Sequence, residues 1–202
     1  GSEMCIRDRD IPVTVKCRTG VDDNDDYEFL KSFISTVKDS GVKTFIIHAR
    51  KGILKGLSPR QNRNIPPLNY QKVYSIKDDF PDLEIIINGG IKNISEAKNH
   101  LNFVDGVMLG RAAYDDPFML SDIDSEIYSN TKVEISRKDL LTEYLDYVHV
   151  MTKKGYDPKI MLKHVFGLKK GEKDAKRFRV KVAEIMNSSS LVENKDELLS
   201  MV

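Results

Sequence analysis

Short apolar runs alternate with amphipathic segments over the first half of the chain. The runs at 11–18, 43–49, 83–90 and 104–111 have the length and β-branched content of strands. Between them, apolar residues recur at helical spacing, which predicts helices over residues 27–41, 70–80 and 95–101. This order predicts parallel strands joined by helical crossovers, in a sheet covered on both faces.

The pattern becomes wholly helical after Pro117. A segment to about residue 128 is followed by a break at Ser129 and Asn130, and further helices begin near residue 137. We place the domain boundary near residue 131. The sequence therefore predicts an α/β unit at 11–130, either half of an eight-fold β/α barrel or a small doubly wound sheet, and a small helical domain at 131–202.

Composition narrows the class of protein. The 202 residues are 40% hydrophobic and 31% charged, and no run approaches the roughly 18 apolar residues of a membrane span. Cys5 and Cys17 have no metal-ligand spacing, so neither a metal site nor a disulfide is expected, and a cytoplasmic protein is the default. Residues 1–10, GSEMCIRDRD, do not resemble a native start and are expected to be tag or misread sequence.

Polar and glycine residues end each predicted strand, and in a β/α barrel these ends form the active-site rim. Glycine turns after the last two strands favour a phosphate site, because backbone N–H groups can approach an anion there. The alternative is that they are only tight turns. The four ends are Lys16-Cys17-Arg18, His48-Ala49-Arg50, Asn88-Gly89-Gly90 and Gly110-Arg111.

Three side chains at this rim invite a chemical interpretation. Lys16 could stabilise negative charge on a bound ring system, and His48 could donate to a ring or a phosphate, although either could be an ordinary solvated or core residue. Cys17 alternates in direction with Lys16, so we expect it to pack toward the surrounding helices.

Two basic segments are candidates for nucleic-acid contacts. The long loop at 48–70 carries Arg50, Lys51, Lys55, Arg60 and Arg63 and no acidic residue, which favours phosphate contacts over a merely solvated loop. Residues 151–181 contain eleven Lys or Arg against three acidic residues within a chain of net charge +1. Lys176 and Arg179 are expected on one helical face there, with Phe178 and Val182 on another.

The acidic run at 22–28, DDNDDYE, has the opposite sign. Acidic side chains favour a helix N-terminus, so we interpret it as the capped start of a helix and assign it no catalytic role.

Several of these motifs, in this order, resemble the A-type tRNA-dihydrouridine synthases. They are VTVKCRTGVDD, FIIHARK, LSPRQNRNIPPLNY, INGGIK and VDGVMLGRAAY, from about residue 11 onward. The resemblance implies the C-terminal half of a TIM barrel followed by a helical tRNA-binding domain. It implies FMN-binding positions at Lys16, His48, Asn88, Gly89, Gly90, Gly110 and Arg111, and tRNA contacts at Arg60, Arg63, Lys176 and Arg179.

The implied reaction is the NADPH-driven, FMN-dependent reduction of a D-loop uridine to 5,6-dihydrouridine. The resemblance places the proton-donating cysteine ahead of residue 11, so we expect this chain alone to bind FMN weakly and not to turn over. Two other interpretations stay open. One is an FMN-dependent barrel oxidoreductase acting on a small dihydropyrimidine-like metabolite, and the other is a non-catalytic tRNA-binding fragment.

Overall fold

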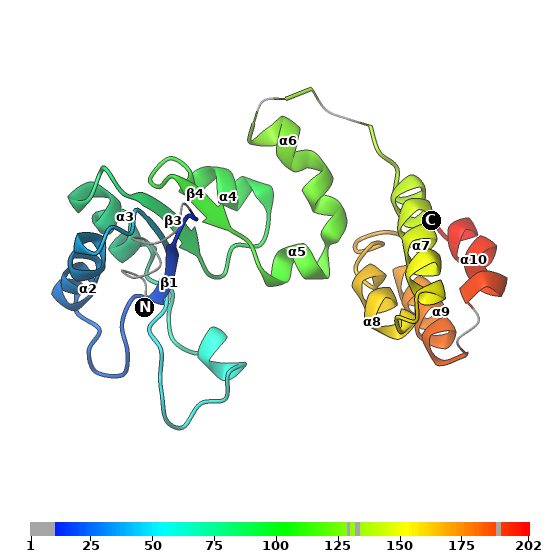
Figure 1. Ribbon diagram of the computed structural model, residues 1–202, viewed down its shortest axis with the longest axis horizontal. Helices are drawn as coiled ribbons and strands as arrows, with labels where there is room; N and C mark the ends of the chain where they lie inside the picture. The colour runs from blue at the N-terminus through cyan, green and yellow to red at the C-terminus, as the bar shows by residue number, and fades with distance from the viewer. Residues whose placement is uncertain (1–10, 129, 132–133, 189–190) are drawn as a thin grey trace. The chain divides into compact units, whose positions relative to one another are not determined.

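The computed structural model describes residues 11–128, 130–131, 134–188 and 191–202. The expectation about residues 1–10 lies outside this range. The chain divides into two compact units, Gly1–Gly110 and Arg111–Val202, and each is described by itself (Figure 1).

Four parallel strands form the sheet of the first unit, as the alternation of apolar runs predicted. They pair in chain order, β1-β2-β3-β4, so that β1 and β4 are the edge strands of this sheet. The strands are β1 (Thr14–Arg18), β2 (Thr44–His48), β3 (Glu84–Asn88) and β4 (Gly106–Met108).

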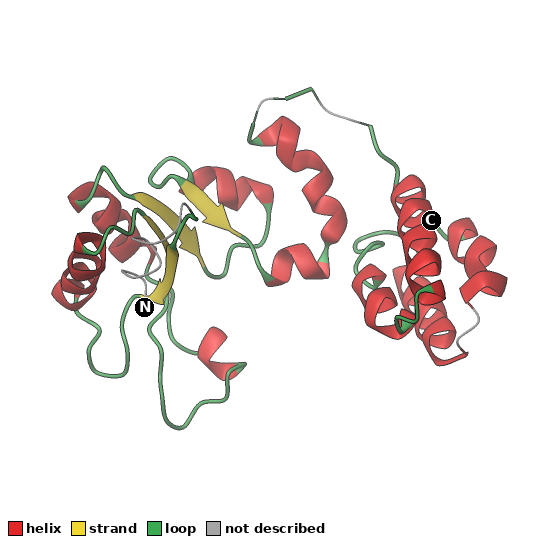
Figure 2. Cartoon of the chain, viewed as in Figure 1, coloured by secondary structure: helices red, strands yellow, loops and turns green. Residues whose placement is uncertain are grey.

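Three helices cover one face of this sheet: α2 (Tyr27–Asp39), α3 (Tyr70–Asp79) and α4 (Ile94–His100), coloured red beside the yellow strands in Figure 2. Successive strand residues point to opposite faces. Phe45 and Ile47 are therefore fully buried under the helices, whereas Ile46 between them is only partly buried on the other face. In the described part of the chain the sheet is thus helix-covered on one face, which corrects the expectation of two covered faces.

The helices begin where side chains can accept from their first N–H groups. Asp26 caps α2 by accepting from the Phe29 N–H at 2.7 Å, which confirms that the acidic run starts a helix. Asn69 and Asn93 cap α3 and α4 in the same way. Because Asn93 is the cap, α4 begins at Ile94, one residue ahead of its predicted start at Ser95.

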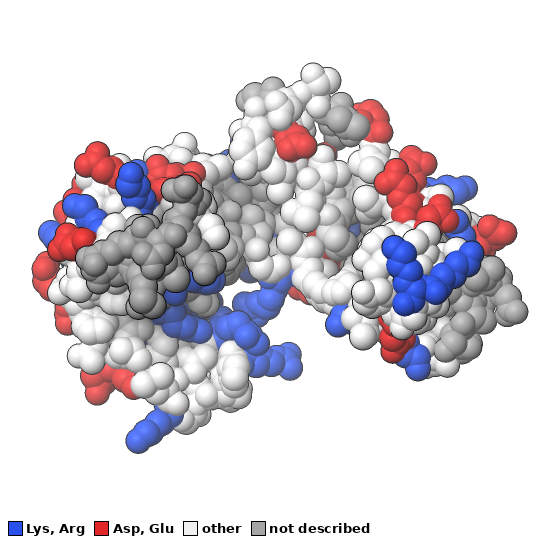
Figure 3. Space-filling model, in the orientation of Figure 1, with Lys and Arg blue, Asp and Glu red and all other residues white. Residues whose placement is uncertain are grey.

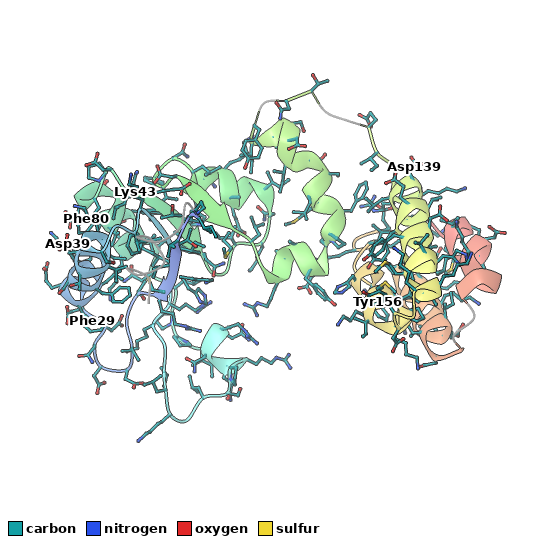
Figure 4. The ribbon with its side chains drawn as sticks, in the orientation of Figure 1. Phe29, Asp39, Lys43, Phe80, Asp139 and Tyr156 are labelled. Carbon is teal, nitrogen blue, oxygen red and sulfur yellow. The ribbon has the colours of Figure 1, made fainter. Side chains whose placement is uncertain are left out.

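The second unit is built from helices in its described residues. Its core lies among α7 (Arg137–Lys153), α8 (Pro158–Leu162), α9 (Ala175–Ser188) and α10 (Leu191–Ser200), where Leu141, Leu145, Phe178 and Val182 are almost fully buried. Asp139, labelled at the start of α7 in Figure 4, forms a reciprocal capping box with Ser136. The other described helices of this unit are α5 (Arg111–Asp115), η2 (Pro117–Asp122), α6 (Ile123–Glu126) and η3 (Lys163–Val165).

The division after Gly110 falls about twenty residues ahead of the sequence-based boundary near residue 131. The reason is that the segment after β4 packs with the helices. Phe118 of η2 contacts the helical core, and the Arg137 guanidinium lies 4.0 Å from its ring centroid. The Asp115 carbonyl also lies so close to Gly167 that a Cβ there would collide with it.

Candidate functional site

The carboxyl ends of three strands bring polar side chains to one rim. The register pairs Arg18 with His48 and His48 with Asn88. Lys16 lies on the same sheet face, and its Nζ donates to the Asn88 Oδ1 at 3.1 Å. The Asn88 Nδ2 donates in turn to the Met108 carbonyl at 2.8 Å. The structure therefore brings together the predicted residues Lys16, His48 and Asn88.

The turn after β3 needs both of its glycines for reasons of backbone and packing. Gly89 and Gly90 have φ of +117° and +74°, values that side chains with a Cβ rarely adopt. A Cβ on Gly89 would lie 2.5 Å from the His48 ring, and one on Gly90 would lie 2.5 Å from Leu68. The Tyr70 hydroxyl also donates to the Gly89 carbonyl at 2.8 Å. These contacts hold the turn against His48.

The last predicted strand is shorter than expected. It ends at Met108 instead of at Gly110 and Arg111, because its partner β3 ends at Asn88 and the ladder stops there. Gly110 is open, with nothing within 4 Å of where its Cβ would lie. Arg111 is the first residue of α5, in the second unit.

A hollow of about 1000 Å³ opens beside this rim. Lys16, Arg18 and His48 line it from the strands, and Arg63 lines it from the long loop. Phe29, labelled on α2 in Figure 4, adds an apolar wall and is 40% exposed. The hollow thus combines an apolar wall with several cations, an arrangement suited to a planar anionic ligand.

The cations in and near the hollow affect one another. Burial, and then the charges of Arg50 and Arg63, lower the pKa of Arg18. Burial likewise lowers the pKa of Lys16. Cations held this close together repel one another, and a bound anion would relieve that repulsion.

Cys17 behaves as a core residue. It packs against the hydrophobic core, as the strand alternation predicted, and burial raises the pKa of its thiol to about 11. The thiol therefore stays protonated near neutral pH and is a poor nucleophile.

Four of the five cations of the long loop fall into two groups, those bonded to other parts of the chain and those exposed. The Arg50 Nη1 donates to the Asn64 and Pro66 carbonyls, so this side chain holds the loop to itself. Lys51 is engaged by the acidic run. Arg60 and Arg63 are exposed in and beside the short helix η1 (Gln61–Arg63). Lys and Arg side chains gather near this loop in Figure 3.

The basic pair in the helical unit lies as predicted. Lys176 and Arg179 are exposed on α9, while Phe178 and Val182 of the same helix are fully buried.

Among the residues that the structure describes, no group of His, Cys, Asp and Glu side chains could hold a metal ion. Within the same residues, no helix is long and apolar enough to cross a membrane.

Two site residues were not singled out from the sequence. The Arg18 Nη1 donates to the carbonyls of Lys51 and Asn62, at 2.9 and 3.1 Å, and so ties β1 to the loop. Asn62 binds both the N–H and the carbonyl of Ile53. The strand alternation could have found Arg18, because it places that residue on the same face as Lys16. Nothing in the spacing of Asn62 indicated its role.

Comparison with known proteins extends the resemblance. The chain is 46% identical over 175 residues to a tRNA-dihydrouridine(20/20a) synthase of Shewanella oneidensis, covering 87% of this chain and 52% of that protein. Proteins of the same name from Vibrio cholerae and Pseudomonas putida are 45% and 43% identical, over 87% and 83% of this chain and 54% and 50% of their own lengths. The chain therefore spans about half the length of these curated relatives.

Among solved structures, the Salmonella typhimurium RcsB response regulator aligns with a TM-score of 0.29 at 14% identity, over 75% of this chain and 88% of that one, which is too low to indicate a common fold. The dihydrouridine synthase (Dus) family model, in contrast, matches residues 5–201. The chain belongs to the dihydrouridine synthase family.

Proposed function

We propose that the protein to which this chain belongs reduces uridine to 5,6-dihydrouridine in the D-loop of tRNA, in the cytoplasm. The observation that carries the proposal is the strand-end rim of Lys16, His48 and Asn88, beside a cation-lined hollow, in a chain of the dihydrouridine synthase family. The relatives' name points to positions 20 and 20a of tRNA. The sheet would be the C-terminal half of a TIM barrel, and residues 131–202 a tRNA-binding domain.

The rim suits FMN, which would carry a hydride from NADPH to the uracil ring. Lys16 would hold a positive charge at the ring edge where negative charge develops, and Asn88 fixes the direction of its ammonium. His48, held against the Gly89 backbone, would donate to the ring or to the phosphate. Gly110 leaves open backbone for an anion, and Arg111 is a further FMN-binding position that the family resemblance implies.

We expect the proton for uracil C5 to come from a group other than Cys17. Its thiol packs on the core and has a pKa of about 11. The resemblance to the family implies a proton-donating cysteine in the part of the protein ahead of this chain. We accordingly expect the chain alone to bind FMN weakly and to reduce no uridine.

The substrate would be gripped through its phosphates. A base has to leave its stack to reach the rim, and this costs a few kcal/mol that contacts elsewhere must offset. Arg60 and Arg63 in the loop, and Lys176 and Arg179 on α9, are exposed cations suited to that task.

The test uses the protein expressed from its gene together with the upstream region. We expect it to purify with flavin absorbance and to convert tRNA uridine to dihydrouridine with NADPH, detected by mass spectrometry. Its tRNA affinity should fall with rising salt and should weaken in Arg60→Ala, Arg63→Ala and Lys176→Ala. A colourless protein that FMN cannot reconstitute, or tRNA binding untouched by all three substitutions, would contradict the proposal. Reduction of a free dihydropyrimidine but not of tRNA would favour a small-metabolite enzyme.

A further inference from the structure

Residues 22–25, which lie in the turn between β1 and α2 and are here called the acidic turn, contact the first residues of the long basic loop at 48–70. The Leu54 N–H donates to the Asp22 Oδ1 at 2.9 Å, and the Lys51 Nζ donates to the Asp22 carbonyl at 3.1 Å. Backbone bonds join the same segments, from Asp22 N–H to the Gly52 carbonyl at 2.7 Å and from Gly52 N–H to the Gly20 carbonyl at 2.9 Å. The turn and the first residues of the loop therefore form one hydrogen-bonded structure.

Asp25 connects the two ends of the loop. Its Oδ1 accepts from the Lys72 Nζ at 2.8 Å, and its Oδ2 lies 3.6 Å from the Lys51 Nζ. Lys51 precedes the tip of the loop, and Lys72 follows its return in the first turn of α3. The Lys72 side chain is 17% exposed and that of Asp25 35% exposed, so this bridge is shielded from water better than an ordinary surface pair.

The turn adopts an unusual backbone to make these contacts. Asp22 has φ of +49°, in the left-handed region that residues other than glycine seldom occupy, although Asp tolerates it better than most. Such a conformation persists where the surroundings hold it, and here the Gly52, Leu54 and Lys51 bonds do so.

We propose that Asp22 and Asp25 are positioning residues, which hold the base of the loop so that Arg60 and Arg63 are ordered before an RNA phosphate backbone arrives. This inference rests on the proposed function, because it assigns the acidic turn a task in tRNA binding. A loop that is ordered in advance loses less conformational entropy on binding. Four of the five loop cations then fall into two groups, with Arg50 and Lys51 shaping the loop and the exposed Arg60 and Arg63 meeting the ligand.

The sign of one substitution separates positioning from simple electrostatics. Asp25→Asn removes a negative charge near a surface that binds a polyanion, so charge alone predicts tighter tRNA binding. Positioning predicts the reverse, because the Lys51 and Lys72 ammonium groups lose the carboxylate charge that they share, although each keeps a bond to a backbone carbonyl. Asp23→Asn is the matched control, since Asp23 is an exposed residue of the same turn and loses the same charge.

The experiment measures tRNA affinity of the full chain at several salt concentrations. We expect Asp25→Asn to bind about three- to tenfold more weakly with an unchanged salt slope, since the phosphate contacts remain, and Asp23→Asn to bind equally or more tightly. Asp25→Glu keeps the charge and serves as a second variant, and it should also weaken binding. Amide hydrogen exchange over residues 53–64 should be faster in both Asp25 variants than in the parent chain.

Each other outcome has a definite meaning. Asp25→Asn behaving like Asp23→Asn, while Arg60→Ala and Arg63→Ala still weaken binding, would overturn the positioning role and leave the proposed function standing. A salt slope lowered in Asp25→Asn would mean a lost phosphate contact and would also overturn it. Arg60→Ala and Arg63→Ala without effect would overturn both the loop's part in the proposed function and the positioning inference that depends on it.

Discussion

Lys16 and Asn88 are joined across the intervening strand β2, with the Lys16 Nζ 3.1 Å from the Asn88 Oδ1. The two residues are 72 positions apart in the chain. Asn88 also donates to the Met108 carbonyl, so its side chain is itself held in place. The Lys16–Asn88 bond therefore positions the ammonium of a β1 residue at the end of β3. This geometry makes Lys16 the residue on which flavin binding should depend most.

We expect Lys16→Met to lower the FMN affinity of the protein expressed with its upstream region by about tenfold or more, since a hydrogen bond to a charged group contributes about 1.5–3 kcal/mol. Quenching of FMN fluorescence in a titration measures this. Lys43→Met is the control, because Lys43, labelled in Figure 4, is exposed ahead of β2 at the opposite end of the strands. Equal loss of affinity in both variants would show that Lys16 acts only through general charge.

The turn after β3 gives a second prediction, on stability. Gly89→Ala and Gly56→Ala both place a Cβ at positive φ, +117° and +85°. A Cβ at Gly56 has nothing within 4 Å, so the free energy of unfolding of that variant should fall by only about 1–2 kcal/mol, the cost of the left-handed backbone. A Cβ at Gly89 would also collide with the His48 ring, and its loss should be clearly larger. Denaturant unfolding measures both, and equal losses would contradict the packing of His48 on this turn.

The strands were predictable because apolar side chains facing the helices recur at every second position, as in Phe45 and Ile47, whereas their order was left open between half of a barrel and a doubly wound sheet. The rim was predictable as well, since parallel strands end at one edge of the sheet. The Lys16–Asn88 bond was not, because it depends on a register that local sequence does not state. For the same reason Asp22 and Asp25 gave only a helix-capping signal, although their main partners lie in the loop and in α3.

The helical unit gives a third prediction, on tRNA binding. Lys176 is an exposed single ammonium on α9, and an arginine there would present a planar fork that binds phosphate in a bidentate manner. We therefore expect Lys176→Arg to tighten tRNA binding by about threefold. Filter binding at fixed salt measures the change. Lys138→Arg, an equally exposed substitution on α7 outside the basic segment, should have no effect. A gain of the same size at Lys138 would make the effect nonspecific.

The last prediction concerns His100, the buried histidine of α4, which is 8% exposed. Its Nδ1 lies 2.7 Å from the Tyr74 hydroxyl, and the Tyr70 ring meets it edge-on at 4.4 Å. Burial lowers the pKa of His100, with a smaller opposing effect from Glu96. The unfolded chain therefore takes up a proton near the ordinary value of 6.5, at a pH where the folded state still excludes it.

The sign of the pH dependence follows from that difference. Stability due to the neutral imidazole is fully present above about pH 6.5 and is lost as pH falls below it toward the lowered folded pKa. Burial raises the pKa of Asp105, but hydrogen bonds from the Ile85 N–H and from Lys77 lower it by more, so that on balance it lies below its ordinary value of 3.8. Asp105 therefore affects stability only at a lower pH than His100 does. The denaturant concentration at the unfolding midpoint of the α/β unit should therefore decrease as the pH is lowered from about 7.5 to about 5.5. His100→Gln should flatten this dependence, whereas replacing the exposed His164 of the helical unit by Gln should not. A dependence that persists unchanged in His100→Gln would assign it to another group.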